Sequence, residues 1–298
     1  MAITAPTLRS DFSGFLNAEM SAPIFEDAAR QSTAMRLFPQ VPLGAEGKDI
    51  PIVLSKVTAG WADEGGEKHK TKGELDIITM SPKKLTAISV MSKEVVRANP
   101  GGYSSSMNAG FAEAFATAFD YAVFHDLGGD GTGTGPFAAA VADTTHVVTI
   151  GTAASLYLDI VSGIKLLNQD GKRVTGIAWD DLTEWLLLNE VDSNDKPLLQ
   201  PSAADGVYAT VANKPLSLVP GLANGDIVGF LGDWSKGAWG VVGGITYDVS
   251  TQATVTINGE LVSLWENNLV AVLAEAEYGF VMKDADYFAA LEYDAGVS

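Results

Sequence analysis

Residues 48–98 read KDIPIVLSKVTAG, then WADEGGEKHKTKGELD, then IITMSPKKLTAISVMSKEVVRA, and this stretch decides the fold. Two segments, Ile50–Val57 and Ile77–Met91, are rich in Ile, Val, Leu and Thr in partial alternation, which predicts strands. The segment between them, Trp61–Glu74, is charged and contains two adjacent glycines, which are typical of a turn. The stretch therefore predicts a long two-stranded hairpin, a β-ribbon with a polar tip.

The tip of this ribbon carries too much charge to enter a hydrophobic core. Its ionisable residues are Asp63, Glu64, Glu67, Lys68, His69, Lys70, Lys72 and Glu74. A long two-stranded ribbon is marginally stable alone in water, because it buries too little surface to offset the entropy of ordering it. We therefore interpret the ribbon as an arm that either a neighbouring chain holds in place or that stays mobile.

Length and composition limit the class of protein. The chain has 298 residues, enough for one large domain or two smaller ones with a sizeable core. Hydrophobic residues make up 47% and aromatic residues 9%, which argues against general disorder. The net charge of −18 argues against a protein that grips nucleic-acid phosphates, because such a protein needs a basic surface. A container for DNA is compatible with this charge, since a negative wall does not adhere to its contents.

The sequence also limits the compartment. It contains no cysteine, which excludes disulfides and thiolate metal sites but leaves the redox compartment open. The first residues, MAITAPTLRSDF, lack the basic and apolar regions of a signal peptide. No apolar run is long enough to span a bilayer. We therefore expect a soluble protein that is made and used without export.

Charge is distributed unevenly along the chain. Residues 46–97 contain nine of the nineteen Lys and Arg together with eight acids, whereas residues 226–298 contain two Lys and eleven acids. Opposite charges of this kind are suited to meet across a subunit boundary, where they set the register of the contact. Charged faces that are simply solvated explain the same composition, so both interpretations stay open.

The regions on either side of the ribbon predict helices. In residues 1–45 we expect one or two short amphipathic helices within an extended lead that prolines interrupt. A long helix is predicted over Ser105–Leu127, with an N-cap among Ser104–Ser106. Its apolar residues fall four apart, at Met107, Phe111, Phe115, Phe119, Val123 and Leu127. At ~1.5 Å per residue it is roughly 35 Å long, enough for a spine, and its aromatic line is interpreted as core.

From about residue 145 the pattern alternates between strands and helices. The predicted elements are a strand at His146–Ile150, a helix at Ser155–Gln169 closed by Asp170-Gly171, a strand at Val174–Trp179, a helix capped by Asp180 and Asp181 that runs to Glu190, short strands at Pro215–Val219, Ile227–Leu231, Ala238–Val242 and Thr254–Ile257, a long strand at Leu261–Phe280, and a helical turn or two at Ala285–Leu291. The whole predicts an α+β fold with a globular middle.

Motifs that carry chemistry are few. The three histidines lie far apart, and none has the spacing of a metal site. The glycine-rich GGDGTGTGPF (128–137) follows a helix and lacks a lysine, so we predict a surface loop or hinge and not a phosphate cradle. Asp126 and Asp130 alone are too few to hold calcium. We therefore predict no catalytic, cofactor-binding or metal-binding residues.

Several stretches, taken in this order, carry a resemblance to a known family. They are GWADEGGEKHKTKGELDIITMSPKKLTAISVMSKEVV (60–96), the long helix, WDDLTEWLLLNEVDSNDKPLLQP (179–201), GDWSKGAWGVV (232–242) and ENNLVAVLAEAEYGFVMKDADYFAAL (266–291). Over nearly its full length the chain resembles the major capsid proteins of tailed bacteriophages.

The resemblance implies the tailed-phage major capsid fold, which is α+β. Its expected parts are an N-terminal arm (1–46), an extended β-hairpin loop (47–84), a peripheral domain (85–144 and 251–298) with the spine helix at 104–128, and an axial α/β domain (145–250). The implied function is structural and without catalysis: self-assembly as hexamers and pentamers into an icosahedral shell that encloses double-stranded DNA.

The resemblance also implies partners and a location. The expected partners are further copies of the chain, scaffolding and portal proteins and, in some shells, decoration proteins. DNA is enclosed without sequence-specific binding, and no cofactor or membrane is expected. The expected location is the virion capsid, assembled in the cytoplasm of the bacterial host.

Intersubunit contacts are expected at the ribbon tip, from Trp61, Asp63, Glu64, Lys68, His69, Lys70 and Lys72. Some relatives join subunits by a Lys–Asn isopeptide bond, which here would pair a tip lysine with Asn267 or Asn268. Two alternatives stay open. One is an encapsulin-like nanocompartment shell of the same fold, and the other is a soluble acidic hydrolase built on Asp and Glu residues. The size of the assembly separates the three.

Overall fold

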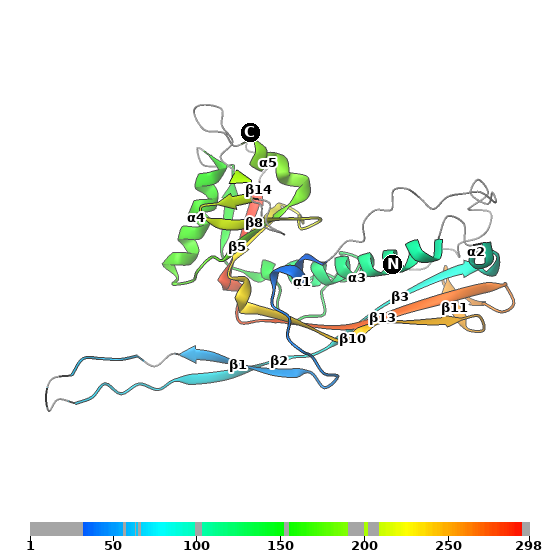
Figure 1. Ribbon diagram of the computed structural model, residues 1–298, viewed down its shortest axis with the longest axis horizontal. Helices are drawn as coiled ribbons and strands as arrows, with labels where there is room; N and C mark the ends of the chain where they lie inside the picture. The colour runs from blue at the N-terminus through cyan, green and yellow to red at the C-terminus, as the bar shows by residue number, and fades with distance from the viewer. Residues whose placement is uncertain are drawn as a thin grey trace.

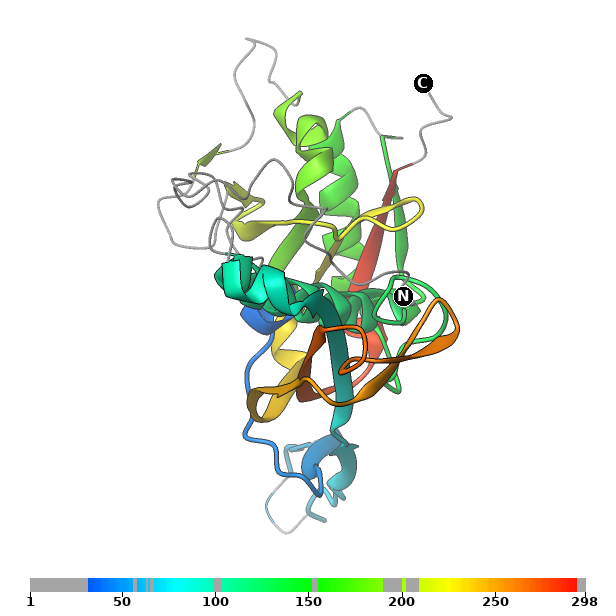
Figure 2. The same ribbon diagram turned by 90° about the vertical axis from the view of Figure 1, so that its right-hand side faces the viewer.

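The computed structural model describes residues 32–55, 58–62, 64, 67–98, 103–151, 155–189, 200–201 and 209–293. In Figure 1 a seven-stranded sheet forms an upper body, a three-stranded sheet beneath helix α3 forms a long bar, and a two-stranded ribbon projects beyond the body. The view along the bar in Figure 2 shows the body on one side of α3 and the three-stranded sheet on the other. Within the described residues, no helix is both long and apolar enough to cross a bilayer.

The helices are α1 (Thr33–Leu37), α2 (Lys93–Ala98), α3 (Tyr103–His125), α4 (Leu156–Gln169) and α5 (Glu184–Leu188), with 3₁₀ turns at Val141–Asp143, Asp181–Thr183, Trp234–Lys236 and Ala285–Tyr287. The strands are β1 (Lys48–Ser55), β2 (Glu74–Met80), β3 (Lys83–Ser92), β4 (Val147–Ile150), β5 (Gly176–Asp180), β6 (Gln200–Pro201), β7 (Ala209–Val211), β8 (Lys214–Val219), β9 (Ile227–Gly232), β10 (Gly237–Ser250), β11 (Thr254–Ile257), β12 (Glu260–Ser263), β13 (Leu269–Met282) and β14 (Phe288–Tyr293). This mixture confirms the α+β prediction.

The spine helix α3 lies along the three-stranded sheet, whose strand order is β10-β13-β3. Its apolar line packs as core: Phe119 contacts Tyr278 of β13 at 5.3 Å between ring centroids, and Phe124 stacks on Phe230 of β9 at 5.9 Å. The helix therefore joins the bar to the body. The four-residue spacing predicts this helix correctly, but the expected N-cap at Ser104–Ser106 is wrong, because these serines lie within the helix.

The body is a sheet with the order β4-β14-β9-β5-β8-β7-β6, and α4 packs against β4, β14 and β9. The predicted helical turns at Ala285–Leu291 are wrong for most of that range. A 3₁₀ turn at Ala285–Tyr287 leads into β14, which pairs parallel to β4 and antiparallel to β9. The segment FAAL (288–291) is buried on both faces, so sheet pairing overrides a local preference that reads as helical.

The other strand boundaries also differ from the prediction. The long strand expected over Leu261–Phe280 is divided into β12 and β13 by a turn that ends at Asn268, where φ is 55°. The strand predicted at Ala238–Val242 is longer than expected, since β10 continues to Ser250. Gly243 lies at an irregularity of the β10–β13 ladder but does not end the strand. The helix expected to reach Glu190 is the short α5, and Glu190 itself lies outside the described residues.

The return strand of the ribbon, predicted as continuous over Ile77–Met91, changes partner at Ser81-Pro82. Before this point β2 pairs antiparallel with β1, and after it β3 pairs antiparallel with β13. Proline has no N–H to donate to a ladder, which fits the place where one pairing ends and the other begins. Only β1 and β2 therefore project as the ribbon, while β3 belongs to the bar.

The root of the ribbon crosses the three-stranded sheet over a pair of glycines, which we call the glycine saddle. Gly240 of β10 and Gly279 of β13 are directly opposite each other in the ladder. A Cβ at Gly240 would lie 2.7 Å from Leu43 Cβ, and a Cβ at Gly279 would lie 2.8 Å from Met80 Cγ. Met80 is fully buried here and Leu43 is nearly so. The saddle thus lets both chain segments that lead to the ribbon lie directly on the sheet.

The segment that precedes the ribbon is anchored on both sides of α1. The buried carboxylate of Asp120 in α3 accepts hydrogen bonds from Ser32 Oγ (2.6 Å), Thr33 N (2.9 Å) and Ala34 N (3.0 Å). Farther along, Trp239 of β10 donates its indole N–H to the Phe38 carbonyl at 3.1 Å. The short helices expected in residues 1–45 are represented by α1, and the rest of that prediction, residues 1–31, lies outside the described part of the chain.

Asp180, at the end of β5, is fully buried and fastens two chain segments. Its carboxylate accepts hydrogen bonds from Leu182 N (3.1 Å), Leu222 N (2.8 Å) and Ala223 N (3.0 Å). The cap predicted at Asp180 is thus confirmed, although what it caps is the 3₁₀ turn before α5.

We expect Asp180→Ala to lower the free energy of unfolding by about 3 kcal/mol, because the buried Leu222 N–H and the partly buried N–H groups of Leu182 and Ala223 lose their acceptor. Urea unfolding followed by circular dichroism measures this change. The matched control is Asp181→Ala, since the Asp181 Oδ1 atom has no hydrogen-bond partner among the described residues. The control should cost less than about 1 kcal/mol. Equal losses in the two variants would contradict the role given to Asp180.

Candidate assembly surface

The buried carboxylates hold the backbone. Asp120 and Asp180 bind the N–H groups described above, and Asp159 Oδ2 accepts a hydrogen bond from Gly151 N at 2.8 Å. Asp233 accepts from Ser235 N at 3.1 Å and Ser235 Oγ at 2.7 Å. Each of these carboxylates accepts hydrogen bonds at a turn or a helix start.

The three histidines lie in different parts of the molecule. His69 Nε2 is 2.9 Å from Thr58 Oγ1 at the exposed ribbon tip, His125 Nε2 is 2.7 Å from the Leu222 carbonyl oxygen, and His146 Nε2 is 2.8 Å from Asp170 Oδ2. Burial lowers the pKa of His125, and the hydrogen bond to the Leu222 carbonyl opposes this shift only in part, so the folded state loses stability as the pH falls below the ordinary value of 6.5. Within the described residues, no group of three or more His, Asp or Glu side chains is placed to hold a metal ion.

The glycine-rich loop after α3 is closed by its own hydrogen bonds. Gly128 N donates to the Thr132 carbonyl at 3.0 Å, and Gly135 N donates to the Asp126 carbonyl at 2.7 Å. Asp130 Oδ1 accepts from Thr132 Oγ1 at 2.8 Å and from Thr132 N at 3.1 Å, and these bonds lower the pKa of the Asp130 carboxyl. These N–H groups point within the loop, as expected of a surface loop and not of a phosphate cradle.

The ribbon has two different apolar faces. Ile50, Ile52 and Ile78 are partly covered on the face that turns toward the bar. On the other face Leu75 is 73% exposed and Ile77 is 61% exposed. Apolar side chains this exposed on a strand pair are typical of a surface that another polypeptide covers.

The tip adds an aromatic side chain to this surface. Trp61 is fully exposed and touches no core residue. The two arms of the tip approach closely where a Cβ at Gly60 would lie 2.9 Å from His69 Cβ. The Glu67–Lys70 ion pair at 2.5 Å is almost fully exposed, so it contributes little to the stability of the subunit. The tip is therefore available for contacts outside its own subunit.

The structure places most of the predicted contact residues together at this tip. Trp61, Glu64, Lys68, His69, Lys70 and Lys72 are all exposed there, and Asp63 lies outside the described residues. Sequence reasoning missed Leu75 and Ile77. Their alternation along β2 is a signal for a strand, but it does not indicate that the face they occupy is uncovered.

Asn267 and Asn268 lie in the turn between β12 and β13, at the end of the bar opposite the ribbon (Figure 1). The Asn267 side chain donates to the Ser263 carbonyl at 2.9 Å, and the Asn268 side chain donates to Glu94. An isopeptide bond between either asparagine and a tip lysine would therefore have to join two subunits.

Two further exposed apolar groups lie away from the ribbon. In α5 and the 3₁₀ turn before it, Leu182 is 80% exposed, Trp185 50% and Leu188 56%. At the far end of the bar, Leu261 is 78% exposed and Trp265 71%. In Figure 1 the ribbon tip, α5 and the β11–β12 hairpin lie at three separate extremities of the molecule. Exposed apolar groups at several extremities are expected of a subunit that meets several neighbours.

Comparison with known proteins also indicates a subunit of a larger assembly. The family model described as "Phage capsid family" matches residues 13–293. The chain is 38% identical over 293 aligned residues to the "Probable major capsid protein gp17" of Mycobacterium phage D29. The alignment covers 94% of this chain and 90% of that protein. It is 35% identical over 305 aligned residues to the protein of the same name from Mycobacterium phage L5, covering 96% of this chain and 92% of that protein.

Solved structures share the fold at lower sequence identity. A chain from Microbacterium phage Oxtober96 superposes with a TM-score of 0.75 at 19% identity, covering 96% of this chain and 99% of that chain. A chain from Gordonia phage Cozz has a TM-score of 0.75 at 20% identity, covering 96% and 94%. A chain described as "Capsid of empty GTA particle computed with C5 symmetry" has a TM-score of 0.59 at 16% identity, covering 96% and 98%.

Proposed function

Because this chain belongs to the phage capsid family, we propose that it builds its shell as hexamers and pentamers in which the ribbon of each subunit lies on a neighbour. It is a structural major capsid protein, and its principal partner is a further copy of itself. The observation that carries the proposal is the ribbon: Trp61, Leu75 and Ile77 are exposed apolar side chains on a projecting element that has little to pack against in its own subunit.

The proposed contact uses apolar and charged groups differently. Trp61, Leu75 and Ile77 would be buried on the neighbour and would provide most of the binding free energy, as large apolar groups do at interfaces. The charged residues Asp63, Glu64, Lys68, Lys70 and Lys72, together with His69, would surround them and fix the register.

The division into domains is part of the proposal. Residues 1–46 serve as the N-terminal arm, 47–84 as the extended hairpin loop, and 85–144 with 251–287 as the peripheral domain that contains α3. Residues 145–236 form the axial domain, whereas we assign β10 (237–250) to the peripheral domain, because its ladder partner is β13. We assign β14 to the axial domain as well, because its ladder partners are β4 and β9.

The surroundings of the shell also belong to the proposal. The shell encloses double-stranded DNA without reading its sequence, which suits a chain of net charge −18. Scaffolding, portal and decoration proteins are the expected further partners. The protein acts in the virion capsid after assembly in the cytoplasm of the bacterial host, and it acts without catalysis.

Negative-stain electron microscopy of the purified protein tests this function. We expect closed particles or ring-shaped capsomers, and elution far ahead of a 31.3 kDa monomer in gel filtration. Small uniform spheres that copurify with a cargo enzyme would instead support the encapsulin-like alternative. A small soluble oligomer would contradict a shell protein.

A further inference from the structure

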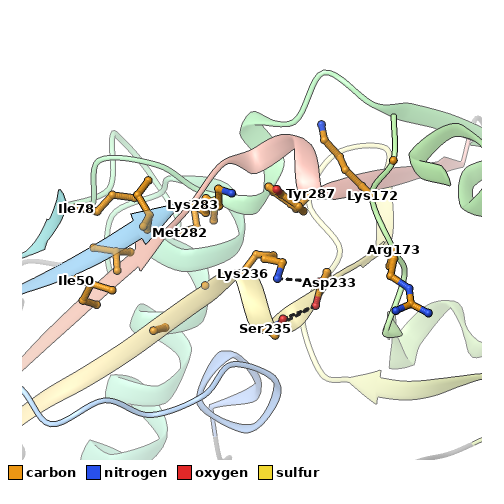
Figure 3. A pocket seen from close by; sticks show the side chains of 15 residues that line it. Ile50, Ile78, Lys172, Arg173, Asp233, Ser235, Lys236, Met282, Lys283 and Tyr287 are labelled. Atoms are coloured by element: carbon orange, nitrogen blue, oxygen red, sulfur yellow. Dashed lines mark hydrogen bonds and ion pairs between the residues drawn. The ribbon is translucent and has the colours of Figure 1, made fainter. Parts of the chain in front are cut away.

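A cavity of about 510 Å³ lies at the root of the ribbon, where its inner face meets β10, β13 and the turn after α4 (Figure 3). We call it the root pocket. One wall is apolar and includes Ile50, Ile52, Ile78 and Met282. The other wall carries the cations Lys172, Lys236 and Lys283 around the ring of Tyr287, with Arg173 farther from this ring (Figure 3). This pocket is separate from the exposed outer face of the ribbon.

Three of the cations in the root pocket, all lysines, lie close to one aromatic ring. The Nζ atoms of Lys172, Lys236 and Lys283 lie 5.6, 5.9 and 5.5 Å from the centroid of Tyr287. Each gains a cation–π contact, but three ammonium groups around one ring also repel one another. An anion placed between them would relieve this repulsion.

Carboxylates near the pocket compensate part of this charge, among them Asp286, which interacts electrostatically with Lys172. Asp233 is the one acid among the described lining residues, and it lies 3.4 Å from Lys236. Asp170 lies 3.8 Å from Lys172, whose side chain is only 16% exposed. Water therefore screens the Lys172 charge incompletely, so its attraction to an added anion is stronger than that of an exposed lysine.

The position of the cluster is unusual for this sequence. Residues 226–298 contain two lysines against eleven acids, and both lysines, Lys236 and Lys283, are in the root pocket. The chain as a whole carries a net charge of −18. A neighbouring copy therefore presents mainly acidic surfaces, to which this pocket is complementary.

The apolar wall decides between two kinds of anionic occupant. A nucleic-acid backbone is polar and has no apolar groups to place against Ile50, Ile52 and Ile78. A polypeptide can place apolar side chains there and carboxylates on the opposite wall. Most of the apolar wall belongs to the ribbon, so the pocket lies on the inner face of the same element whose outer face and tip form the proposed subunit interface.

We propose that the root pocket receives an acidic segment of a second copy of this chain, with carboxylates between Lys172 and Lys283 and apolar side chains against Ile50 and Ile78. This inference rests on the proposed function, because it requires subunits to meet. It adds a second contact at the base of the ribbon, distinct from the one that the tip makes.

Lysine acetylation followed by mass spectrometry tests the occupant. Dissociated subunits, DNA-free shells and DNA-filled particles are treated with the same acetylating reagent. We expect Lys172, Lys236 and Lys283 to be modified at least fivefold more slowly in DNA-free shells than in dissociated subunits. Equal modification in shells and subunits would overturn the inference, and so would protection that appears only in DNA-filled particles, because the occupant would then be nucleic acid.

Zero-length carbodiimide crosslinking identifies the partner segment. Shells are assembled from mixed light and isotopically heavy subunits, and we expect crosslinked peptides of mixed isotope that join a root-pocket lysine to an Asp or Glu. Crosslinks within single subunits only would contradict the docking of a second copy. If no particles form at all, the proposed function fails and this inference fails with it, whereas particles with unprotected lysines refute this inference alone.

A charge variant gives an independent readout. The double variant Lys172→Gln/Lys283→Gln should raise the subunit concentration needed for half-assembly about tenfold, and this threshold should depend less on salt than in the native chain. The matched control is Lys165→Gln, which removes an exposed charge from α4 outside the pocket and should leave the threshold unchanged. The inference would be contradicted if the control and the double variant behaved alike.

Discussion

Deletion of residues 63–72 should leave a folded subunit that no longer forms closed particles. The shortened loop still connects Ser55 to Glu74, the last pair of the β1–β2 ladder, so the hairpin can close. The deleted residues that the structure describes are exposed and contribute little to the core. We therefore expect the melting temperature of the free subunit to change little, whereas electron microscopy should show no shells. Shells of normal size from this variant would contradict the role of the ribbon in assembly.

A single substitution refines this result. Trp61→Ala should cost about 2 kcal/mol for each contact between subunits, because a buried tryptophan is among the strongest contributors to an interface. That loss corresponds to a roughly 30-fold weaker contact. Trp61→Phe is the matched control, and it should recover most of the assembly because the ring still fills the same site. If both variants assembled like the native chain, the contact would not depend on this side chain.

The second large effect is expected at the glycine saddle, from Gly240→Ala. The added methyl group would lie 2.7 Å from Leu43 Cβ and 2.8 Å from the Val41 carbonyl oxygen. A backbone atom cannot move aside as a flexible side chain can, so the segment that leads into the ribbon must shift. We expect a loss of about 1–3 kcal/mol in the free energy of unfolding, visible as a lower melting temperature, together with a lower yield of particles.

Gly244→Ala is the matched control in the same strand. A Cβ at Gly244 meets nothing within 4 Å, so the substitution should change stability by less than about 0.5 kcal/mol. Particle yield should also stay at the native level. Equal losses in the two variants would show that β10 is sensitive to any added methyl group, and the saddle would then have no special role.

Elements set by local pattern could be predicted from the sequence. The four-residue apolar spacing predicts α3, and it suffices because that periodicity alone defines the buried side of a helix. For α4, Ser155 accepts a hydrogen bond from Leu158 N and Gly171 adopts a φ of 69°, so the start and stop signals of that helix operate as predicted.

Elements set by distant partners could not be predicted. The segment FAAL (288–291) is a strand because β4 and β9 lie on either side of it, and its own composition does not contain that information. Likewise, residues on both sides of Ser81-Pro82 have the composition of strands. Composition cannot indicate that the first strand pairs with β1 and the second with β13.

The candidate sites also include some residues that local sequence could predict and others that depend on the folded chain. The charges of the tip indicate an exposed segment, and the structure places the described ones on the surface. Leu75 and Ile77 could not be recognised, because alternation fixes two faces without indicating which one is covered. The root pocket was also beyond prediction, since only the folded chain brings Lys172, Lys236 and Lys283 to one ring.

Because the root of the ribbon is buried, each subunit fixes the direction in which its ribbon projects before it contacts a neighbour. Met80 is completely enclosed by the subunit's own core, so the direction is a property of folding and not of docking. At ~3.3 Å per residue β2 extends roughly 20 Å from Met80 back to Glu74, and a tilt of about 10° at its base would displace its far end by roughly 3.5 Å. If the ribbon leaves every subunit at the same angle, all copies present it to their neighbours in the same orientation. The ribbon then loses less conformational freedom when subunits associate.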